Sequence, residues 1–360
     1  MKILSLFDGM ACGALAMQSA GIEIDKYIAY EIDKYAIQTA QHNFPFIEER
    51  GDVFKADFTE YAGFDYLIGG SPCTYWSIAQ TKNRETVASG MGWELFRQYV
   101  RALHEAKPHF FLYENNKSMS AAIRASITET FGFEPILINS ALVSAQNRQR
   151  LYWCGIRQAD GTYKKADIQQ PADRGILLKD ILETNAVTWL EKACTYITRC
   201  QGAIIENTLE KHQHTMVAEP LNVDGIKYCN DKNIAHICRP FGSKAKVITE
   251  NEKAPTLMAA MGTGGGNGVY YAENMKIREA TKAAPIYEVK DGFITVKGKK
   301  YPIKLVDGFY IIRKLTVREC MRLQTVPEWY EWPVSKSQAY KMLGNGWTVE
   351  VIAHLLRGLK

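Results

Sequence analysis

The sequence predicts an α/β protein: a mostly parallel sheet with helices on both faces, plus a smaller, mostly β domain. Three observations lead to this class. Short apolar runs alternate with amphipathic segments over the first third of the chain. After about residue 179 this alternation gives way to short strand-like pieces separated by turns. With 360 residues and 46% hydrophobic content, the chain can bury a sizeable core in one large domain or two.

The first third contains four apolar runs that predict buried strands. They are KILSLF (2–7), YIAYEI (27–32), FDYLIGG (64–70) and HFFLYEN (109–115). A glycine turn leading into a helix is expected over 9–20, and amphipathic helices over 34–44 and 93–106. Pro45 ends the second of these helices and Lys107-Pro108 the third. Alternating strands and helices of this kind form a parallel sheet.

Chemically informative residues fall at the ends of these strands. The segments are FDGMACG (7–13), Glu31, GGSPC (69–73) and ENN (114–116). Ligands of open α/β sheets bind at the carboxyl ends of the strands, where the connecting loops gather. We therefore expect the four segments to form one binding site.

Three features indicate a nucleoside cofactor. Gly9 and Gly13 flank a turn that opens a helix, which lets a ligand approach the backbone closely. Glu31 lies roughly 20 residues further on, where an acidic side chain can accept hydrogen bonds from a ribose. Asp52 can reach an adenine amino group. The structural alternatives are tight strand-helix packing, a solvated carboxylate and a Gly-Asp turn, respectively.

Cys73 follows Pro72 at the end of an expected strand, and two interpretations are open. Most intracellular cysteines are inert buried thiols. A proline turn at a strand end can instead hold a thiolate partly exposed for attack. Glu114, on a neighbouring strand end, would place a carboxyl group in the same cleft, unless it serves only as a cap for the helix expected over 117–130.

The composition argues against a secreted, membrane-spanning or zinc-binding protein. The eight cysteines lack the density of a disulfide framework, so we expect a reducing cytoplasm. No apolar run approaches the roughly 20 residues of a membrane span. His212, His214, Cys229, His236 and Cys238 lack the paired spacing of a zinc site, so no metal is expected. The net charge of +5 permits nucleic-acid binding without requiring it.

The segments resemble, in order, the motifs of DNA cytosine-5 methyltransferases, which use S-adenosylmethionine. FDGMACG is similar to the first motif, in a spelling closest to the mammalian de novo enzymes. YEIDKYA, GDVF, GGSPC and YENN are similar to the ribose, adenine, Pro-Cys and Glu-Asn motifs. QNRQRLYW (146–153), RKLTVRECMRLQTVPEWY (313–330) and LGNGWTVEVIAHLL (343–356) are similar to the remaining three. The resemblance spans nearly the whole chain and implies a Rossmann-like methyltransferase sheet in an enzyme of prokaryotic or phage type.

The resemblance also implies roles for individual residues. Cys73 would add to carbon 6 of a cytosine flipped out of the duplex, and Glu114 would contact N3 and the exocyclic amine. Arg150 would hold the base oxygen, and Arg148 would support this network or the thiolate, unless it forms an ordinary cross-strand charge pair. The residues implied to bind S-adenosylmethionine are Phe7, Gly9, Ala11, Cys12, Glu31, Ile32, Asp52, Val53, Pro72, Asn345 and Trp347.

Family architecture predicts the domains and the DNA contacts. Residues 1–179, completed by 335–360, would form the catalytic domain, and 180–334 the target-recognition domain. Two Asp-Gly pairs, at 291–292 and 307–308, predict hairpins in the latter. The expected DNA contacts are Ser77, Arg84 and Gly90 after the nucleophile, and Thr263, Gly264, Gly265 and Asn267 in a glycine-rich segment. Either segment can instead be a plain surface loop.

Three of the motifs depart from the family pattern. Asn116 stands where valine is usual, and Trp76 stands where phenylalanine is common. The last motif reads Gly-Asn-Gly-Trp at 344–347, where Gly-Asn-Ser-Val is more usual. The cysteine, glutamate and arginines are all present, which favours an active enzyme.

The expected function is methylation of carbon 5 of cytosine in a specific double-stranded DNA sequence. Two alternatives stay open: a tRNA cytosine-5 methyltransferase, because one branch of the family modifies RNA, and a catalytically silent DNA-binding relative. We expect a monomer in the cytoplasm of a bacterium or phage-infected cell. Any cognate restriction endonuclease would act separately.

Overall fold

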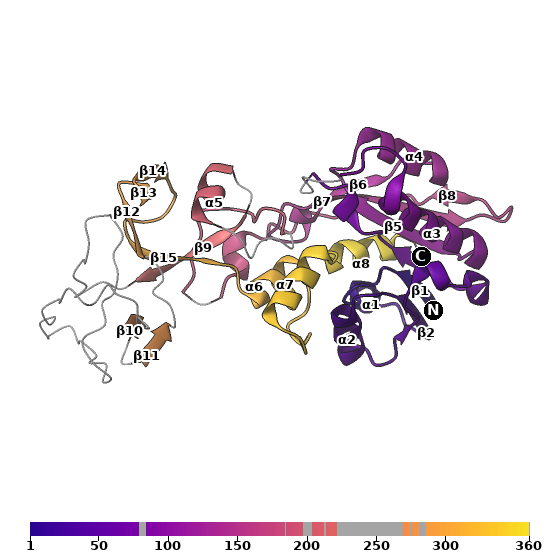
Figure 1. Cartoon of the computed structure of the whole chain (residues 1–360), viewed down its shortest axis with the longest axis horizontal. Helices are drawn as coiled ribbons and strands as arrows, with labels where there is room; N and C mark the ends of the chain where they lie inside the picture. Colours follow the sequence, from indigo (N-terminus) through magenta and orange to yellow (C-terminus); the bar gives the residue numbers. More distant parts are fainter. Residues whose placement is uncertain are drawn as a thin grey trace, which may run out of the picture. The chain divides into compact units, whose positions relative to one another are not determined.

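The structure, a computed structural model, contains two compact units (Figure 1). It describes residues 1–78, 84–183, 185–196, 204–211, 214–221, 269–273, 276–280 and 286–359. The first unit comprises Met1–Ile181, Lys192–Gln201 and Thr316–Lys360, and the second comprises Leu182–Glu191 and Gly202–Leu315. The second unit ends at Leu315, before the boundary at residue 334 that the sequence suggested. The reason is that α6 (Val317–Leu323) packs against α7 (Lys336–Asn345) within the first unit. Among the described residues, no helix is long and apolar enough to cross a membrane.

An eight-stranded sheet forms the centre of the first unit. Its order is β3-β2-β1-β4-β5-β7-β6, with β8 paired to β7. The neighbouring strands β3, β2, β1, β4 and β5 are parallel to one another. Strand β7 is antiparallel to β5, β6 and β8. The bounds are β1 (Lys2–Leu6), β2 (Lys26–Tyr30), β3 (Glu48–Glu49), β4 (Tyr66–Gly69), β5 (Phe110–Asn116), β6 (Ile136–Asn139), β7 (Gln149–Arg157) and β8 (Tyr163–Lys165). The predicted α/β class is confirmed.

Helices cover both faces of this sheet. Side chains alternate along a strand, so Leu67 packs into the core with α3 while Ile68 lies against Gly13 of α1 on the other face. The C-terminal α8, whose apolar face is buried, packs against α1. The further helices of this unit are α1 (Cys12–Ser19), α2 (Lys34–Asn43), α3 (Gly90–Ala106), α4 (Ala121–Phe131) and α8 (Val349–Arg357).

The second unit is mostly antiparallel β, as predicted. Five strands pair in the order β14-β13-β12-β15-β9, and β10 pairs with β11. Buried aliphatic and aromatic side chains of this sheet and of α5 form a core of their own. The bounds are α5 (Ile205–Lys211), β9 (Met216–Leu221), β10 (Val269–Glu273), β11 (Lys276–Ala280), β12 (Ile286–Lys290), β13 (Phe293–Val296), β14 (Lys299–Pro302) and β15 (Gly308–Lys314).

The two Asp-Gly pairs behave differently. Asp291-Gly292, with φ of 52° and 76°, forms the predicted tight turn between β12 and β13. The second prediction is wrong, because β15 pairs with β12 and β9 and not with β14. The next tight turn is made by Lys297-Gly298, with φ of 51° and 81°. Asp307 instead accepts hydrogen bonds from the backbone N–H groups of Asp291 (3.0 Å) and Gly292 (3.4 Å), so it supports the first turn.

Candidate active site

The strand register aligns the ends of four parallel strands. Leu6 at the end of β1 pairs with Tyr30 of β2 and with Gly69 of β4, and Gly69 pairs with Tyr113 of β5. The next residues along these strands are Phe7, Glu31, Gly70 and Glu114. The four segments therefore meet at one edge of the sheet, as the strand pattern predicts. This edge includes β1 and β4, where the strand order reverses and ligands of such folds bind.

Cys73 opens a single 3-10 turn, Cys73–Tyr75, directly after Pro72. Its carbonyl accepts hydrogen bonds from the N–H groups of Trp76 (3.1 Å) and Ser77 (2.9 Å), which fix the turn. The cysteine is partly exposed, so it is not sealed in the core. Burial of the thiol raises its pKa, and the nearby Arg150 guanidinium opposes this rise. The charge of Glu114 adds to the rise in the pKa, whereas Arg148, like Arg150, favours the thiolate.

Glu114 is held from two sides. Its Oε1 lies 3.1 Å from Nε of Arg150, and its Oε2 accepts a hydrogen bond of 2.9 Å from the indole N–H of Trp347. Arg150 pairs with Asn116 across β5 and β7, two residues from Glu114, so both side chains extend from the same face. Gly70 passes so close that a Cβ there would lie 2.7 Å from Glu114 Oε2.

Asn115 ties the nucleophile loop to the neighbouring strand. Its side chain is 1% exposed, and its Nδ2 donates to the carbonyl oxygen of Ser71 (3.1 Å) and to the Tyr113 hydroxyl (3.2 Å). The hydroxyls of Tyr113 and Ser71 lie 2.6 Å apart and share a hydrogen bond. Because Ser71 is two residues before Cys73, this buried network fixes the start of the turn relative to Glu114.

Arg148 is buried and serves the backbone. Its guanidinium donates to the carbonyl oxygens of Tyr196 (2.9 Å), Gly344 (3.2 Å) and Gly346 (2.9 Å). Burial, with the nearby Arg150, lowers its pKa to about 10, so it stays charged at neutral pH. It joins the start of β7 to the turn between α7 and α8. The charge of Arg148 also opposes the rise in the pKa of Cys73, and its predicted support of the thiolate stays a prediction.

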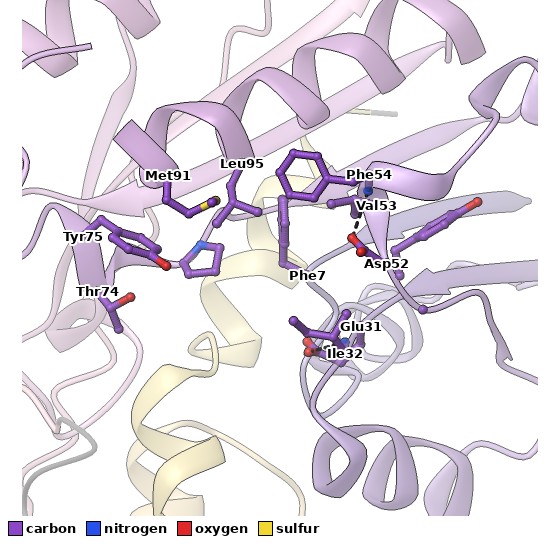
Figure 2. Close-up of a pocket in the computed structure, with 13 residues that line it drawn as sticks. Phe7, Glu31, Ile32, Asp52, Val53, Phe54, Thr74, Tyr75, Met91 and Leu95 are labelled. Atoms are coloured by element: carbon purple, nitrogen blue, oxygen red, sulfur yellow. Dashed lines mark hydrogen bonds between the residues drawn. The ribbon is translucent and has the colours of Figure 1, made fainter. Parts of the chain in front are cut away.

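A cavity of about 390 Å³ opens beside Pro72 and Thr74. Figure 2 shows Tyr75, Met91 and Leu95 on one side and Glu31, Ile32 and Asp52 on the other, with Phe7 between them. The lining residues are Phe7, Tyr30, Glu31, Ile32, Gly51, Asp52, Val53, Phe54, Pro72, Thr74, Tyr75, Met91 and Leu95. Apolar walls with a few carboxylates suit a ring system that carries polar substituents.

The carboxylate of Glu31 is oriented by the backbone at the rim of this cavity. Oε2 accepts from the N–H of Gly9 (2.9 Å), and Oε1 accepts from the N–H groups of Ile32 (2.8 Å) and Asp33 (2.9 Å). A carboxylate offers about four acceptor positions, so it can still accept from a hydroxyl. Asp52 Oδ1 accepts from the N–H of Phe54 (3.0 Å), as in the turn-forming alternative, yet Asp52 also lines the cavity.

Two further carboxyl groups lie near Glu31, and both are buried. Oδ1 of Asp8 accepts from the hydroxyls of Ser5 (2.5 Å) and Tyr27 (2.6 Å), while Oδ2 has no hydrogen-bond partner in the described part of the chain. Burial raises the pKa of Asp8 to about 6 and, with the charges of Asp8 and Glu31, raises the pKa of Glu49 to about 8. The surroundings of Asp8 and Glu49 disfavour the charged form of both carboxyl groups, and a cationic ligand nearby would stabilise that charged form.

The described part of the segment after Cys73 is held by side chains. Nε of Arg84 donates to the carbonyl oxygen of Trp76 (3.1 Å), and its Nη2 donates to that of Ser118 (2.7 Å). The buried Trp76 indole donates to Oε2 of Glu85 (3.0 Å). Arg84 therefore stabilises the loop in this structure. Ser77 is partly buried, and Gly90 begins α3 with φ of 84°.

Comparison with known proteins identifies the family. The family model for C-5 cytosine-specific DNA methylases matches residues 1–360. The chain belongs to this family. The protein is thus a DNA cytosine-5 methyltransferase, and the predicted activity is confirmed at this level. Membership in a methyltransferase family implies the use of S-adenosylmethionine and a DNA substrate.

Relatives of the methylase family match along the whole chain. The orphan methyltransferase M.SPRI of Bacillus phage SPR is 25% identical over 438 aligned residues, which cover 100% of this chain and 97% of the relative. The type II methyltransferase M1.ScrFI of Lactococcus lactis subsp. cremoris is 26% identical and covers 98% of this chain and 76% of its own. The crystal structure of the S. pombe Dnmt2 methyltransferase covers 100% of this chain and 98% of its own, with TM-score 0.55 and 14% identity, and supports the fold.

The methylase's predicted site residues fall into three groups. Cys73, Glu114 and Arg150 lie together, whereas Arg148 contacts backbone carbonyls. The predicted cofactor residues that line the cavity are Phe7, Glu31, Ile32, Asp52, Val53 and Pro72. Those outside its lining are Gly9, Ala11, Cys12, Asn345 and Trp347. The predicted DNA contacts Thr263, Gly264, Gly265 and Asn267, and all the zinc candidates except His214, lie outside the described residues.

Several lining residues were missed in the sequence. Tyr30, Gly51, Phe54 and Thr74 are immediate sequence neighbours of predicted residues, and Tyr75 is two residues from Cys73, so that closeness in sequence was a usable signal. Met91 and Leu95 come from α3, and their spacing of four residues places them on one helix face. Met91 is 50% exposed, and an exposed methionine in the first turn of a helix was the one available hint.

Proposed function

We propose that this methylase acts on a cytosine within a specific duplex DNA sequence, with Cys73 as the nucleophile and Glu114 as the group that contacts N3. The supporting observation is the convergence of a partly exposed cysteine, a carboxylate and a guanidinium beside the cavity. Carbon 5 of cytosine is too electron-poor to attack a methyl donor directly. Covalent addition at the neighbouring carbon removes this obstacle.

The proposed reaction begins when the Cys73 sulfur bonds to carbon 6 of the base and the thiol proton passes to the Glu114 carboxylate. Because burial raises the pKa of the thiol, the loss of the proton is coupled to the arrival of the base. The ring electrons move toward N3, which takes a proton from Glu114, and carbon 5 becomes electron-rich. Once carbon 5 is methylated, it gives up its own proton to water, the double bond returns, the sulfur leaves, and the N3 proton goes back through Glu114 to Cys73. Arg150 holds Glu114 through Nε throughout.

S-adenosylmethionine supplies, when bound, a methyl group on a positively charged sulfur. We propose that Glu31 accepts from its ribose hydroxyls and Asp52 from its adenine amino group, while Phe7, Val53 and Leu95 contact the ring. The cavity fits this ligand class, because apolar side chains line one side of it and two carboxylates lie on the other. The unpaired, buried oxygen of Asp8 lies near Glu31 and suits a positively charged ligand.

The target base must leave the duplex to reach Cys73, which the exposed edge of the sheet permits. We propose that the second unit, Leu182–Glu191 with Gly202–Leu315, reads the DNA sequence. We further propose that the protein acts as a monomer. We expect it in the cytoplasm of a bacterium or phage-infected cell, since the relatives come from such sources. A cognate restriction endonuclease, where one exists, acts as a separate protein.

Transfer of radiolabelled methyl groups tests this proposal. The purified protein with labelled S-adenosylmethionine should label duplex DNA and leave tRNA unlabelled, and Cys73→Ala should abolish the transfer. Bisulfite sequencing of DNA from an expressing host would then identify the sequence around the methylated cytosines. Label in tRNA alone would contradict the proposed substrate, and DNA binding without transfer would contradict the proposed activity.

A further inference from the structure

Trp347 contacts the proposed catalytic carboxylate and not the cofactor cavity. It lies between α7 and α8, at a position where valine is more usual in the family motif. Its indole N–H donates to Oε2 of Glu114 at 2.9 Å, across 233 residues of sequence. It is absent from the residues that line the cavity. Valine has no such donor, so this contact is a property of this chain.

The turn that carries Trp347 is fixed by buried polar side chains. Arg148 donates to the carbonyl oxygens of Gly344 and Gly346, on either side of Asn345. Nε2 of Gln324, which is 1% exposed, donates to the carbonyl oxygen of Leu343 at 2.7 Å. Because these hydrogen bonds hold the backbone just before Trp347, its indole N–H keeps a fixed direction.

The buried hydroxyl of Thr348 extends this support on the other side of Trp347. It donates to Oε1 of Gln324 at 2.9 Å and lies 2.8 Å from the Ser140 hydroxyl. Thr348 is 2% exposed, so water does not compete for these bonds. The residues on both sides of Trp347 are thus anchored to the core of the first unit.

We propose that Trp347 is a positioning residue for Glu114 in the addition step. This inference rests on the proposed function, in which Glu114 gives a proton to N3. The last torsion of a glutamate side chain is soft, so an unheld carboxylate rotates through many orientations. Arg150 at Oε1 and Trp347 at Oε2 fix both ends of the carboxylate. The second position on each oxygen stays open, so one oxygen can pass a proton to N3 and the other can accept from the exocyclic amine.

The addition step can be observed without a methyl donor. When the Cys73 sulfur bonds to carbon 6 and N3 is protonated, carbon 5 can take a proton from water. It then releases its original hydrogen, the carbon-sulfur bond breaks and the base is restored. A tritium label at carbon 5 of cytosine in duplex DNA is therefore released to solvent, and its rate reports addition by Cys73 and Glu114 alone.

The test is Trp347→Phe, which keeps an aromatic ring and removes the N–H donor. We expect tritium release and methyl transfer at saturating cofactor to fall by the same factor, about tenfold or more. The Kd for S-adenosylmethionine should stay within about twofold of wild type. Trp329→Phe, the same change at a half-exposed tryptophan that packs on Phe44, is the matched control and should leave all three quantities unchanged.

A double-variant comparison separates positioning from a general structural role. If Trp347 acts through Glu114, then adding Trp347→Phe to Glu114→Gln should lower tritium release by less than about twofold. An unchanged exchange rate with a weakened cofactor Kd in Trp347→Phe would overturn the inference, because Trp347 would then serve the cofactor alone. Absence of both exchange and transfer in the wild type would instead defeat the proposed function itself.

Discussion

Gly70→Ala is expected to impair catalysis more than folding. The added Cβ would lie 2.7 Å from Oε2 of Glu114, 2.9 Å from the Glu114 carbonyl oxygen and 3.5 Å from Nε1 of Trp347. The carbonyl belongs to β5 and must shift slightly to relieve its own contact, which lowers stability. The carboxylate can move, so the substitution should push it off its two donors.

The size of this effect follows from the distances. Ordinary van der Waals contact begins at 3.4 Å, so the carboxylate must retreat by about 0.7 Å. A misplacement of about 1 Å at a reacting group costs on the order of 100-fold in rate, so we expect kcat to fall about 10- to 100-fold. Crowding of this kind also lowers the free energy of unfolding by about 1–3 kcal/mol.

Single-turnover methyl transfer to duplex DNA at saturating cofactor measures the change in rate, well below the melting temperature. Gly358→Ala is the matched control, because its Cβ would lie 2.9 Å from Ile168 at the end of α8. It should lose comparable stability and keep its kcat. A Gly70→Ala enzyme with kcat within about twofold of wild type would refute the reasoning that carboxylate placement limits the rate.

Three further substitutions test other parts of the site. Burial raises the pKa of Asp8 from its ordinary value of 3.8 to about 6, so the contribution of Asp8 to the stability of the wild type is full below pH 3.8 and is lost as pH rises through 6. In urea unfolding, Asp8→Asn should therefore be more stable than wild type at pH 8 by up to about 3 kcal/mol. The two proteins should be equally stable below about pH 4. No difference at pH 8 would contradict this. Glu31→Gln should raise the calorimetric Kd for S-adenosylmethionine about tenfold or more, and an unchanged Kd would remove Glu31 from the cofactor site. Arg148→Met removes the donors of three backbone carbonyls and should lower the unfolding free energy by about 2–4 kcal/mol; wild-type stability with lost activity would restore a direct catalytic role.

The sequence predicted the parts of the site that depend on strand ends. Glu31, Cys73 and Glu114 each follow an apolar run, and parallel strands bring their carboxyl ends to one edge whatever the loops between them do. This alignment of the strand ends follows from the backbone pairing of the strands and does not depend on side-chain contacts. The first hairpin, at Asp291-Gly292, was also predicted from a local signal. Its turn needs two consecutive residues with positive φ, and an Asp-Gly pair readily adopts this conformation.

Contacts between distant segments escaped prediction. Trp347 and Glu114 are 233 residues apart, and no pattern in either segment indicates the other. Arg148 looked like a partner for charges, yet its acceptors are backbone carbonyls, which carry no sequence signature. Asp307 resembled a turn residue of its own strand pair but supports another turn, since the order of strands in a sheet is set by packing and not by adjacency.

The bond between the Cys73 sulfur and carbon 6 of cytosine is the central claim. It can be trapped with duplex DNA that carries 5-fluorocytosine at the methylated position, because fluorine at carbon 5 cannot leave as a proton does. The adduct formed in the presence of S-adenosylmethionine should survive denaturation, and mass spectrometry should locate it on the peptide that contains Cys73. An adduct on any other cysteine, or methyl transfer that persists in Cys73→Ala, would contradict the account.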